Sequence, residues 1–152
     1  MKRKPLDDAD CPIARALDAV GDWWSLLIVR DAMLGARRFG AFQESLAISR
    51  NILTHRLRAL VEHGVLQLTP ASDGGAFMEY TLTQKGRDLF PVIVALRQWG
   101  EKHLFGREVC PTQLVDRGGG QPVRPLRVQA QSGRPLEITD TELKLMRRAR
   151  RS

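Results

Sequence analysis

A polar face on the segment of residues 49–63 carries the side chains of this sequence that are best suited to recognition by hydrogen bonding. Its outward positions, together with the two residues that open the segment, are Asn51, Thr54, His55, Arg58, Ser49 and Arg50. Arginine pairs with guanine and asparagine with adenine in the major groove of DNA, while serine and threonine reach phosphates or either base. A helix that only faced water would more often carry Glu and Lys. The pattern favours a DNA-contacting helix, and an ordinary surface helix is the alternative.

Positive charge gathers around this face. The 152 residues include 24 Lys and Arg against 17 Asp and Glu, a formal charge of +7. Residues 37–58 hold five arginines and one acid, Glu44. Such an excess favours a polyanionic partner, although a solvated surface would look the same by charge alone. Arg37 and Arg38 are expected to contact the DNA backbone.

Two apolar helices are expected ahead of this region. The first covers residues 12–20, because Pro12 suits a first helical position and Gly21 ends the apolar pattern. The second covers residues 22–34, with Asp22 as its N-cap. It is apolar on most sides and is expected mainly in the core. Core packing is also the preferred role of its two tryptophans, with a small-molecule pocket as the alternative.

A short helix over residues 39–46 and a fourth helix over residues 50–63 follow. Ser49 is a good N-cap for the fourth helix, Ile48 can pack on Leu53 as a hydrophobic staple, and Gly64 supplies the stop. The expected buried stripe of this helix consists of Ile52, Leu53, Leu57, Leu60 and Val61.

A β-hairpin and a long helix complete the expected domain. Residues 65–69 and 77–82 are typical of strands, and the turn-rich residues 70–75 lie between them. A helix is then expected over residues 84–105, capped by Thr83 and kinked by Pro91.

This order of elements is that of a winged helix-turn-helix, a mainly α fold with a small β-hairpin wing. In that architecture the second helix of the motif, here the segment that starts at Ser49, enters the major groove. We expect an N-terminal arm over residues 1–10, the domain over 11–106 and a Gly/Pro/Arg-rich appendage over 107–152. Within the appendage, residues 139–151 are predicted to form a short basic helix or a disordered tail.

Five stretches of the sequence, in this order, resemble the HxlR family of transcription regulators. They are the stretch 11–31 with Gly-Asp-Trp-Trp-Ser-Leu-Leu-Ile-Val-Arg-Asp at its end, Arg-Arg-Phe-Gly-Ala-Phe (37–42), Ile-Ser-Arg-Asn-Ile-Leu-Thr-His-Arg-Leu (48–57), Leu-Val-Glu-His-Gly-Val (60–65) and Glu-Tyr-Thr-Leu-Thr-Gln-Lys-Gly (79–86). The resemblance covers about residues 10–105. It implies a homodimer, joined by the first and last helices of the domain, that binds operator DNA and is expected to act as a repressor.

The apolar surplus of the last helix supports a dimer independently. Large exposed apolar patches on a monomer usually mark interfaces. The residues expected at this interface are Ile13, Leu17, Leu89, Ile93, Leu96 and Trp99. A two-fold dimer places its recognition helices about one DNA turn apart, so the operator is expected to be pseudo-palindromic double-stranded DNA.

Three features depart from the family pattern. Trp23 stands where relatives often have Lys, which is expected to alter packing rather than activity. The hairpin tip has no Lys or Arg and contains Asp73, so its phosphate contacts are expected to be weak or to come from backbone amides. Some relatives carry a zinc-ribbon-like tail with paired cysteines, but the four ligands of a structural zinc site are missing here. We therefore expect no metal and no cofactor.

Cys11 has two interpretations. The resemblance implies that a cysteine at this place senses oxidants or electrophiles, and a thiolate at a helix N-terminus is favoured by the helix dipole. A small, buried apolar residue is the alternative, since free cysteine is among the most buried residue types. A disulfide between Cys11 and Cys110 is not expected in a reducing compartment.

Other functional classes have less support in the sequence. The three histidines lack nearby carboxylates or nucleophiles, and no phosphate-binding glycine loop is present, so the protein is not expected to be an enzyme. No apolar run approaches the roughly 18 residues of a membrane span, and no signal peptide is recognisable, so a cytoplasmic location is expected. A winged-helix protein-interaction module that does not read DNA remains the alternative function.

Overall fold

The computed structural model describes Leu6 and residues 10–146, so most of the expected N-terminal arm lies outside the described residues. The chain divides into two compact units, Met1–Leu96 and Arg97–Ser152. Among the described residues, no helix combines the length and the apolar character that crossing a bilayer would need.

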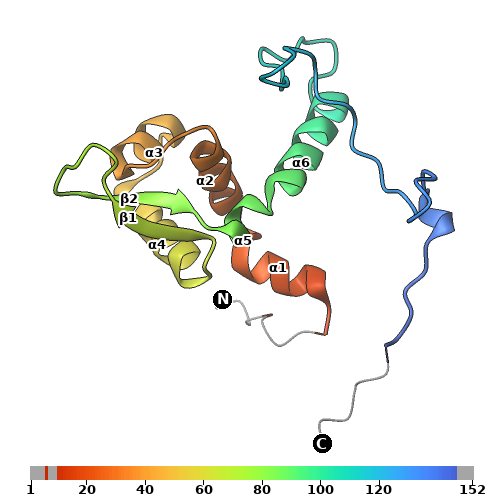
Figure 1. Cartoon of the computed structure of the whole chain (residues 1–152), viewed down its shortest axis with the longest axis horizontal. Coiled ribbons are helices and arrows are strands. Elements are labelled where there is room, and N and C mark those ends of the chain that lie inside the picture. Colours follow the sequence, from red (N-terminus) through yellow and green to blue (C-terminus); the bar gives the residue numbers. More distant parts are fainter. Residues whose placement is uncertain (1–5, 7–9, 147–152) are drawn as a thin grey trace, which may run out of the picture. The chain divides into compact units, whose positions relative to one another are not determined.

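The first unit has the layout of a winged helix-turn-helix (Figure 1). Its elements, with the helix that continues into the second unit, are α1 (Pro12–Val20), α2 (Trp23–Met33), α3 (Phe39–Leu46), α4 (Arg50–Glu62), β1 (Leu66–Pro70), β2 (Met78–Leu82), α5 (Gln84–Arg87) and α6 (Phe90–His103). Helix α2 packs against α3, α4 and β2, and α4 also packs against β1. The mainly α fold with a two-stranded wing is therefore confirmed.

Local capping fixes where three of the helices begin. Asp22, Ser49 and Thr83 each accept a hydrogen bond from the backbone N–H three residues later, at 2.9, 3.4 and 3.0 Å. These bonds satisfy backbone donors that have no partner inside the helix. At the other end of α4, Gly64 adopts φ +69°, a left-handed conformation that glycine accepts without steric cost. The predicted caps and this stop are confirmed.

The hairpin is antiparallel, with a register that runs from Leu66 opposite Leu82 to Pro70 opposite Met78. Each strand starts one residue later than expected. Phe42 of α3 lies edge-on to Tyr80 of β2, with ring centroids 6.4 Å apart. This contact joins the first helix of the motif to the wing through the core.

The buried core is built from α1 to α4 and the start of β1. Its buried apolar residues are Val20, Ile28, Val29, Phe42, Ile48, Leu53, Leu57, Leu60, Val65 and Leu66. Two core predictions are wrong. Ile52 is 41% exposed, because it lies at the edge of the α4 stripe rather than on it, and Trp23 is 75% exposed at the first turn of α2. Trp24, in contrast, packs against the core as expected.

The single helix expected over residues 84–105 is wrong, because the structure has two helices there. Helix α5 ends at Arg87, a turn follows at residues 88–89, and α6 begins at Phe90. Pro91 has no N–H to donate to the carbonyl of Arg87, and its ring would collide with that carbonyl in a continuous helix. In the first turn of a new helix the missing N–H costs nothing. The proline therefore causes an interruption just upstream rather than a kink.

The second unit consists of the end of α6 followed by turns, two isolated β-bridges and a 3₁₀ turn, η1 (Ile138–Asp140). The Gln98 side chain donates to the Arg124 carbonyl at 3.0 Å and accepts from the Leu126 N–H at 2.8 Å. These two bonds hold an extended segment beside this part of the helix. Of the two alternatives for residues 139–151, the helix is wrong over residues 141–146, which are not helical. Residues 147–152 lie outside the described residues.

Candidate nucleic-acid interface

Helix α4 presents the predicted recognition face because its opposite side is fixed in the core. Leu53, Leu57 and Leu60 are each no more than 1% exposed. With 3.6 residues per turn, burial of these three positions turns the intervening polar positions outward. All six predicted residues of this helix and its cap, Ser49, Arg50, Asn51, Thr54, His55 and Arg58, are exposed.

These outward side chains differ in how much of their hydrogen-bonding capacity is already used. The Thr54 hydroxyl donates to the Arg50 carbonyl at 2.8 Å, and the Arg50 guanidinium lies 5.3 Å from the centre of the Phe39 ring. The side chains of Asn51, His55 and Arg58 have no hydrogen bond or ion pair with any described residue. Their donors and acceptors are available to a partner molecule.

Arg56, which the sequence did not single out, links α4 to α2. Its Nε lies 3.3 Å from Oδ1 of Asp22, the residue that also caps α2. The Asp22 carboxylate accepts from both the N–H and the hydroxyl of Ser25. No local pattern points to this pair, since its members are 34 positions apart.

At the start of α3, Arg37 and Arg38 are paired with acids of the wing. Glu79 of β2 is 4% exposed, and its two carboxylate oxygens lie 3.6 Å from Arg37 Nη1 and 3.6 Å from Arg38 Nε. Arg38 Nη2 also lies 2.6 Å from Oδ2 of Asp73 at the hairpin tip. The Tyr80 N–H donates to the Arg37 carbonyl at 2.8 Å, which brings the two segments side by side.

The pair at the hairpin tip perturbs the ionisation of both of its members. The pKa of Asp73 is lowered below its usual value by a hydrogen bond from the Gly75 N–H and then by the hydrogen bond and charge of Arg38. The pKa of Arg38 is raised, mainly by its hydrogen bond to Asp73. Both groups therefore remain charged throughout the neutral range.

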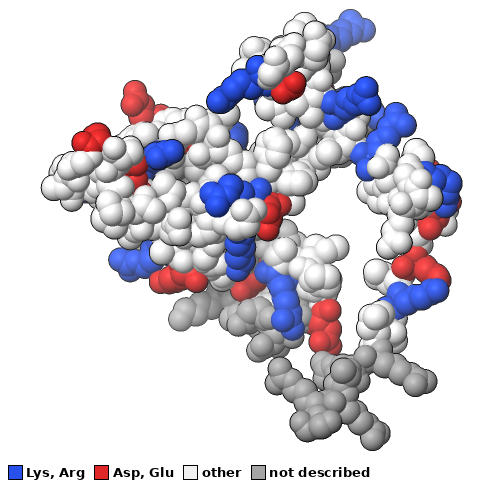
Figure 2. Space-filling model, viewed as in Figure 1, with Lys and Arg blue, Asp and Glu red and all other residues white. Residues whose placement is uncertain are grey.

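Much of the arginine charge in residues 37–58 is thus already opposed by carboxylates. Three of the five arginines, Arg37, Arg38 and Arg56, have a carboxylate within 4 Å, whereas Arg50 and Arg58 have none among the described residues. Figure 2 shows acidic and basic side chains next to one another toward the hairpin end of the first unit. The expected backbone contacts of Arg37 and Arg38 stay predictions, since DNA would have to share or displace these acids.

The predicted dimer residues fall into two groups. Ile13, Leu17, Leu96 and Trp99 are 69%, 45%, 50% and 57% exposed. Leu89 and Ile93 instead pack against the core of their own chain. The first group is accessible to a second subunit, and the second group is only partly so.

Cys11 occupies the N-cap position of α1 and is exposed, so it is not part of the core of its own chain. Cys110, in the second unit, is half-buried, and neither cysteine is in a disulfide.

Among the described residues, no three His, Cys, Asp or Glu side chains are placed to hold a metal ion together.

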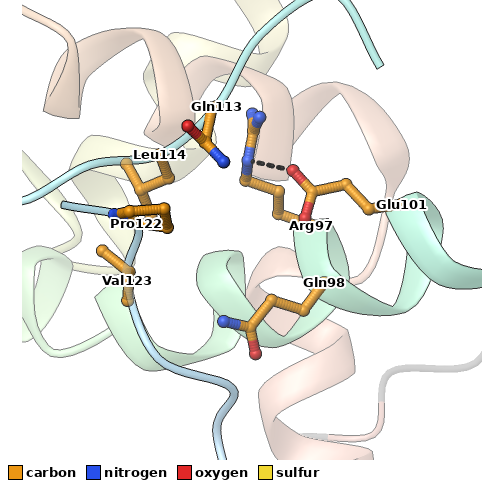
Figure 3. A pocket seen from close by; sticks show the side chains of 7 residues that line it. All are labelled: Arg97, Gln98, Glu101, Gln113, Leu114, Pro122 and Val123. Carbon is orange, nitrogen blue, oxygen red and sulfur yellow. Dashed lines mark ion pairs between the residues drawn. The ribbon is translucent and has the colours of Figure 1, made fainter. Parts of the chain in front are cut away.

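Two cavities among the described residues are small or shallow. One of about 80 Å³ in the second unit is lined by Arg97, Gln98, Glu101, Gln113, Leu114, Pro122 and Val123 (Figure 3). The Arg97 guanidinium in this cavity already pairs with Glu101 at 2.7 Å and donates to the Thr112 carbonyl at 2.5 Å. That space suits a few water molecules rather than a substrate. An apolar hollow of about 300 Å³ lies over Trp23, Trp24 and Leu27.

Comparison with known proteins gives consistent matches. The profile of the HxlR-like helix-turn-helix family matches residues 19–108. Mb3122 of Mycobacterium bovis, named as an HTH-type transcriptional regulator, is 41% identical over 124 residues, which cover 82% of this chain and 78% of that protein.

Solved structures agree with these matches. The crystal structure of PA1607, described as a candidate transcription factor, has 52% identity and a TM-score of 0.88, and the match covers 91% of this chain and 97% of PA1607. The redox regulator HypR, in its oxidized form, has 30% identity and a TM-score of 0.55, covering 61% of this chain and 97% of HypR.

Proposed function

The chain belongs to the HxlR-like helix-turn-helix family, and we propose that it is a transcription regulator that binds double-stranded DNA as a homodimer, with α4 in the major groove. One observation carries the proposal. Asn51, His55 and Arg58 project from a rigid helix without partners among the described residues. Amide, imidazole and guanidinium groups on one helix face match the donors and acceptors of base edges.

The direct test is binding to DNA from upstream of the protein's own coding region, measured by gel shift and fluorescence anisotropy. Asn51→Ala and Arg58→Ala are each expected to weaken binding by about 1–3 kcal/mol if the side chain reads a base. Arg127→Ala removes the same charge from an exposed position in the second unit and serves as the control. Equal losses of DNA affinity in Arg58→Ala and Arg127→Ala would mean that only general charge attraction holds the DNA. Binding without sequence preference would mean the same. A chain that binds no DNA at all would favour the protein-interaction module.

The homodimer is supported by the exposed apolar residues of α1 and α6. Ile13 and Leu96 expose apolar area that a monomer would leave in water, and such area usually marks an interface. Sedimentation analysis is expected to give a dimer for the full chain and a shift toward monomer for Ile13→Asp with Leu96→Asp. A monomeric wild-type chain that still binds a palindromic operator would contradict this arrangement.

Regulation through Cys11 is a second part of the proposal. Its thiol is exposed at the N-terminal end of α1, the helix that carries Ile13 and Leu17, and a relative of known structure is a redox regulator. An adduct on Cys11 would add bulk beside these dimer residues. Operator affinity is expected to change after treatment with a quinone or diamide in wild type and not in Cys11→Ser. Equal responses of the two proteins would remove Cys11 from the mechanism.

A further inference from the structure

The hairpin tip brings an acid to Arg38, one of the two arginines that the sequence predicts to contact the DNA backbone. Arg38 stands at the N-cap position of α3, and its side chain is 46% exposed. Asp73, 35 positions further along the chain, lies 2.6 Å from it and is 60% exposed. Both groups are reachable from solvent, so a phosphate can approach the same guanidinium that the carboxylate now occupies.

The turn holds the carboxylate in this position. The Gly75 N–H donates to Oδ1 of Asp73 at 2.9 Å, which leaves Oδ2 for Arg38. A Cβ atom on Gly75 would lie 2.9 Å from that Oδ1, so the absence of a side chain there makes room for the bond. The acid is therefore held by its own loop as well as by Arg38.

The charges around Arg38 cancel locally. Arg37 and Arg38 face Glu79 and Asp73, and Ser72 donates a further hydrogen bond to Glu79 at 3.2 Å. Glu79 is buried and serves both arginines, so it belongs to the framework of the domain. Asp73 is the exposed member, and it is the acid that a DNA phosphate could replace.

We propose that Asp73 is a specificity-determining residue, because its carboxylate competes with DNA phosphate for Arg38 and so weakens binding that is independent of sequence. This inference rests on the proposed DNA binding through α4. Phosphate contacts supply most of the affinity for non-operator DNA, whereas base contacts distinguish the operator. An acid that blocks one phosphate contact per subunit lowers affinity for every duplex. We expect the proportional loss to be larger where base contacts from α4 do not hold the protein in register.

The test compares Asp73→Asn with wild type on two fluorescent duplexes. One is the operator, taken from the upstream DNA that the wild-type protein shifts, and the other is a scrambled duplex of equal length. Asparagine keeps an oxygen that can accept from Gly75 and removes the charge. Affinity for the scrambled duplex is expected to rise about 2- to 5-fold per subunit, the equilibrium factor that an exposed ion pair contributes. The slope of log K against log salt should become more negative by up to about 0.9 per subunit. Operator affinity is expected to rise less, so the specificity ratio falls.

Asp116→Asn is the matched control. Asp116 also accepts hydrogen bonds from two glycine N–H groups in a turn, at 3.1 and 3.0 Å, but has no ion-pair partner among the described residues. Asp116→Asn therefore changes the net charge by the same amount as Asp73→Asn, and it should leave the affinities for the operator and the scrambled duplex nearly unchanged. Thermal unfolding shows whether Asp73→Asn is folded. If it is not, Asp73→Ser, which keeps an oxygen that can form the turn, takes its place.

A double-mutant cycle identifies the path of the effect. In an Arg38→Gln background, Asp73→Asn is expected to have no more effect than Asp116→Asn. Weaker binding of Asp73→Asn to both duplexes would mean that the acid orients Arg38 for phosphate, and that result would overturn the proposal. So would an equal rise on both duplexes or the same gain without Arg38. Failure of the proposed function is distinguished by Asn51→Ala and Arg58→Ala, which report on α4 alone.

Discussion

The outer face of α4 and the junction between α3 and the hairpin both carry arginines, but the two regions use them differently. On α4, Arg58 faces outward without an acidic partner among the described residues. At the junction, Arg37 and Arg38 are held against Glu79 and Asp73. One region offers its charge to a partner, whereas the other has its charge largely compensated within the fold.

This difference shows why a count of charges along the chain does not give the charge available to DNA. Basic residues contribute to phosphate binding in proportion to the counterions that they displace from DNA. An arginine that already has a carboxylate within 4 Å must first exchange or share it. We therefore expect the junction to contribute more to the geometry of the wing than to the attraction of DNA.

The largest expected effect is on the apolar contact that holds the junction together. Phe42→Ala is expected to lower the free energy of unfolding by about 3–5 kcal/mol, because Phe42 is 0% exposed and its removal leaves a cavity against Tyr80. Urea unfolding followed by circular dichroism measures the loss. Phe77→Ala at the exposed hairpin tip is the control, and an equal loss in the two variants would contradict a core role for Phe42.

Arg58→Ala and Arg37→Ala test the comparison between the regions directly. We expect Arg58→Ala to cost about 1–3 kcal/mol of operator binding and Arg37→Ala less than about 1 kcal/mol, since Arg37 is already paired with Glu79. Anisotropy titrations at one fixed salt concentration give both values. If Arg37→Ala costs as much as Arg58→Ala, the junction is as available to DNA as α4 is.

Glu79→Gln tests whether the junction is structural. Loss of this buried carboxylate removes the partner of two half-exposed arginines, so the free energy of unfolding is expected to fall by about 1–2 kcal/mol after allowance for solvent screening of the arginines. Glu62→Gln, at an exposed position of α4, is the control and should change the free energy of unfolding by less than about 0.5 kcal/mol. Comparable values for the two variants would show that Glu79 does not stabilise the fold.

The smallest effect expected is that of pH on the Asp73–Arg38 pair. The pKa of Asp73 is lowered in the folded protein, so the contribution of the pair is complete above the ordinary aspartate pKa and is lost as pH falls through the lowered value. The ratio of non-operator affinities between Asp73→Asn and wild type should therefore stay constant from about pH 8 to pH 5. A ratio that declines within this range would show that Asp73 is protonated there.

Much of the fold could be predicted because the signals are local. Helices α1 and α3 have the predicted limits, and the caps at Asp22, Ser49 and Thr83 form as expected. A cap depends on residues three positions apart, which a sequence displays directly. The same holds for the outward face of α4, since helical spacing alone relates its residues.

Errors arose where burial depends on neighbours that are distant in the sequence. Trp23 and Ile52 are apolar side chains at the margin of their helices, and only the packing of other elements decides whether a margin is covered. A kink at Pro91 was expected within one helix, but the chain is interrupted between α5 and α6 instead, because the carbonyl that the proline ring would strike belongs to Arg87, four residues earlier.

The sequence by itself determined the order of elements, their caps and the polar face of α4, because these follow from spacing within one segment. Tertiary structure alone decided which arginines are available. The pairs of Arg38 with Asp73 and of Arg56 with Asp22 join residues 35 and 34 positions apart. Such pairs form only after the hairpin and α2 have packed beside the motif, since an ion pair needs both charges within a few ångströms and no local pattern brings them there.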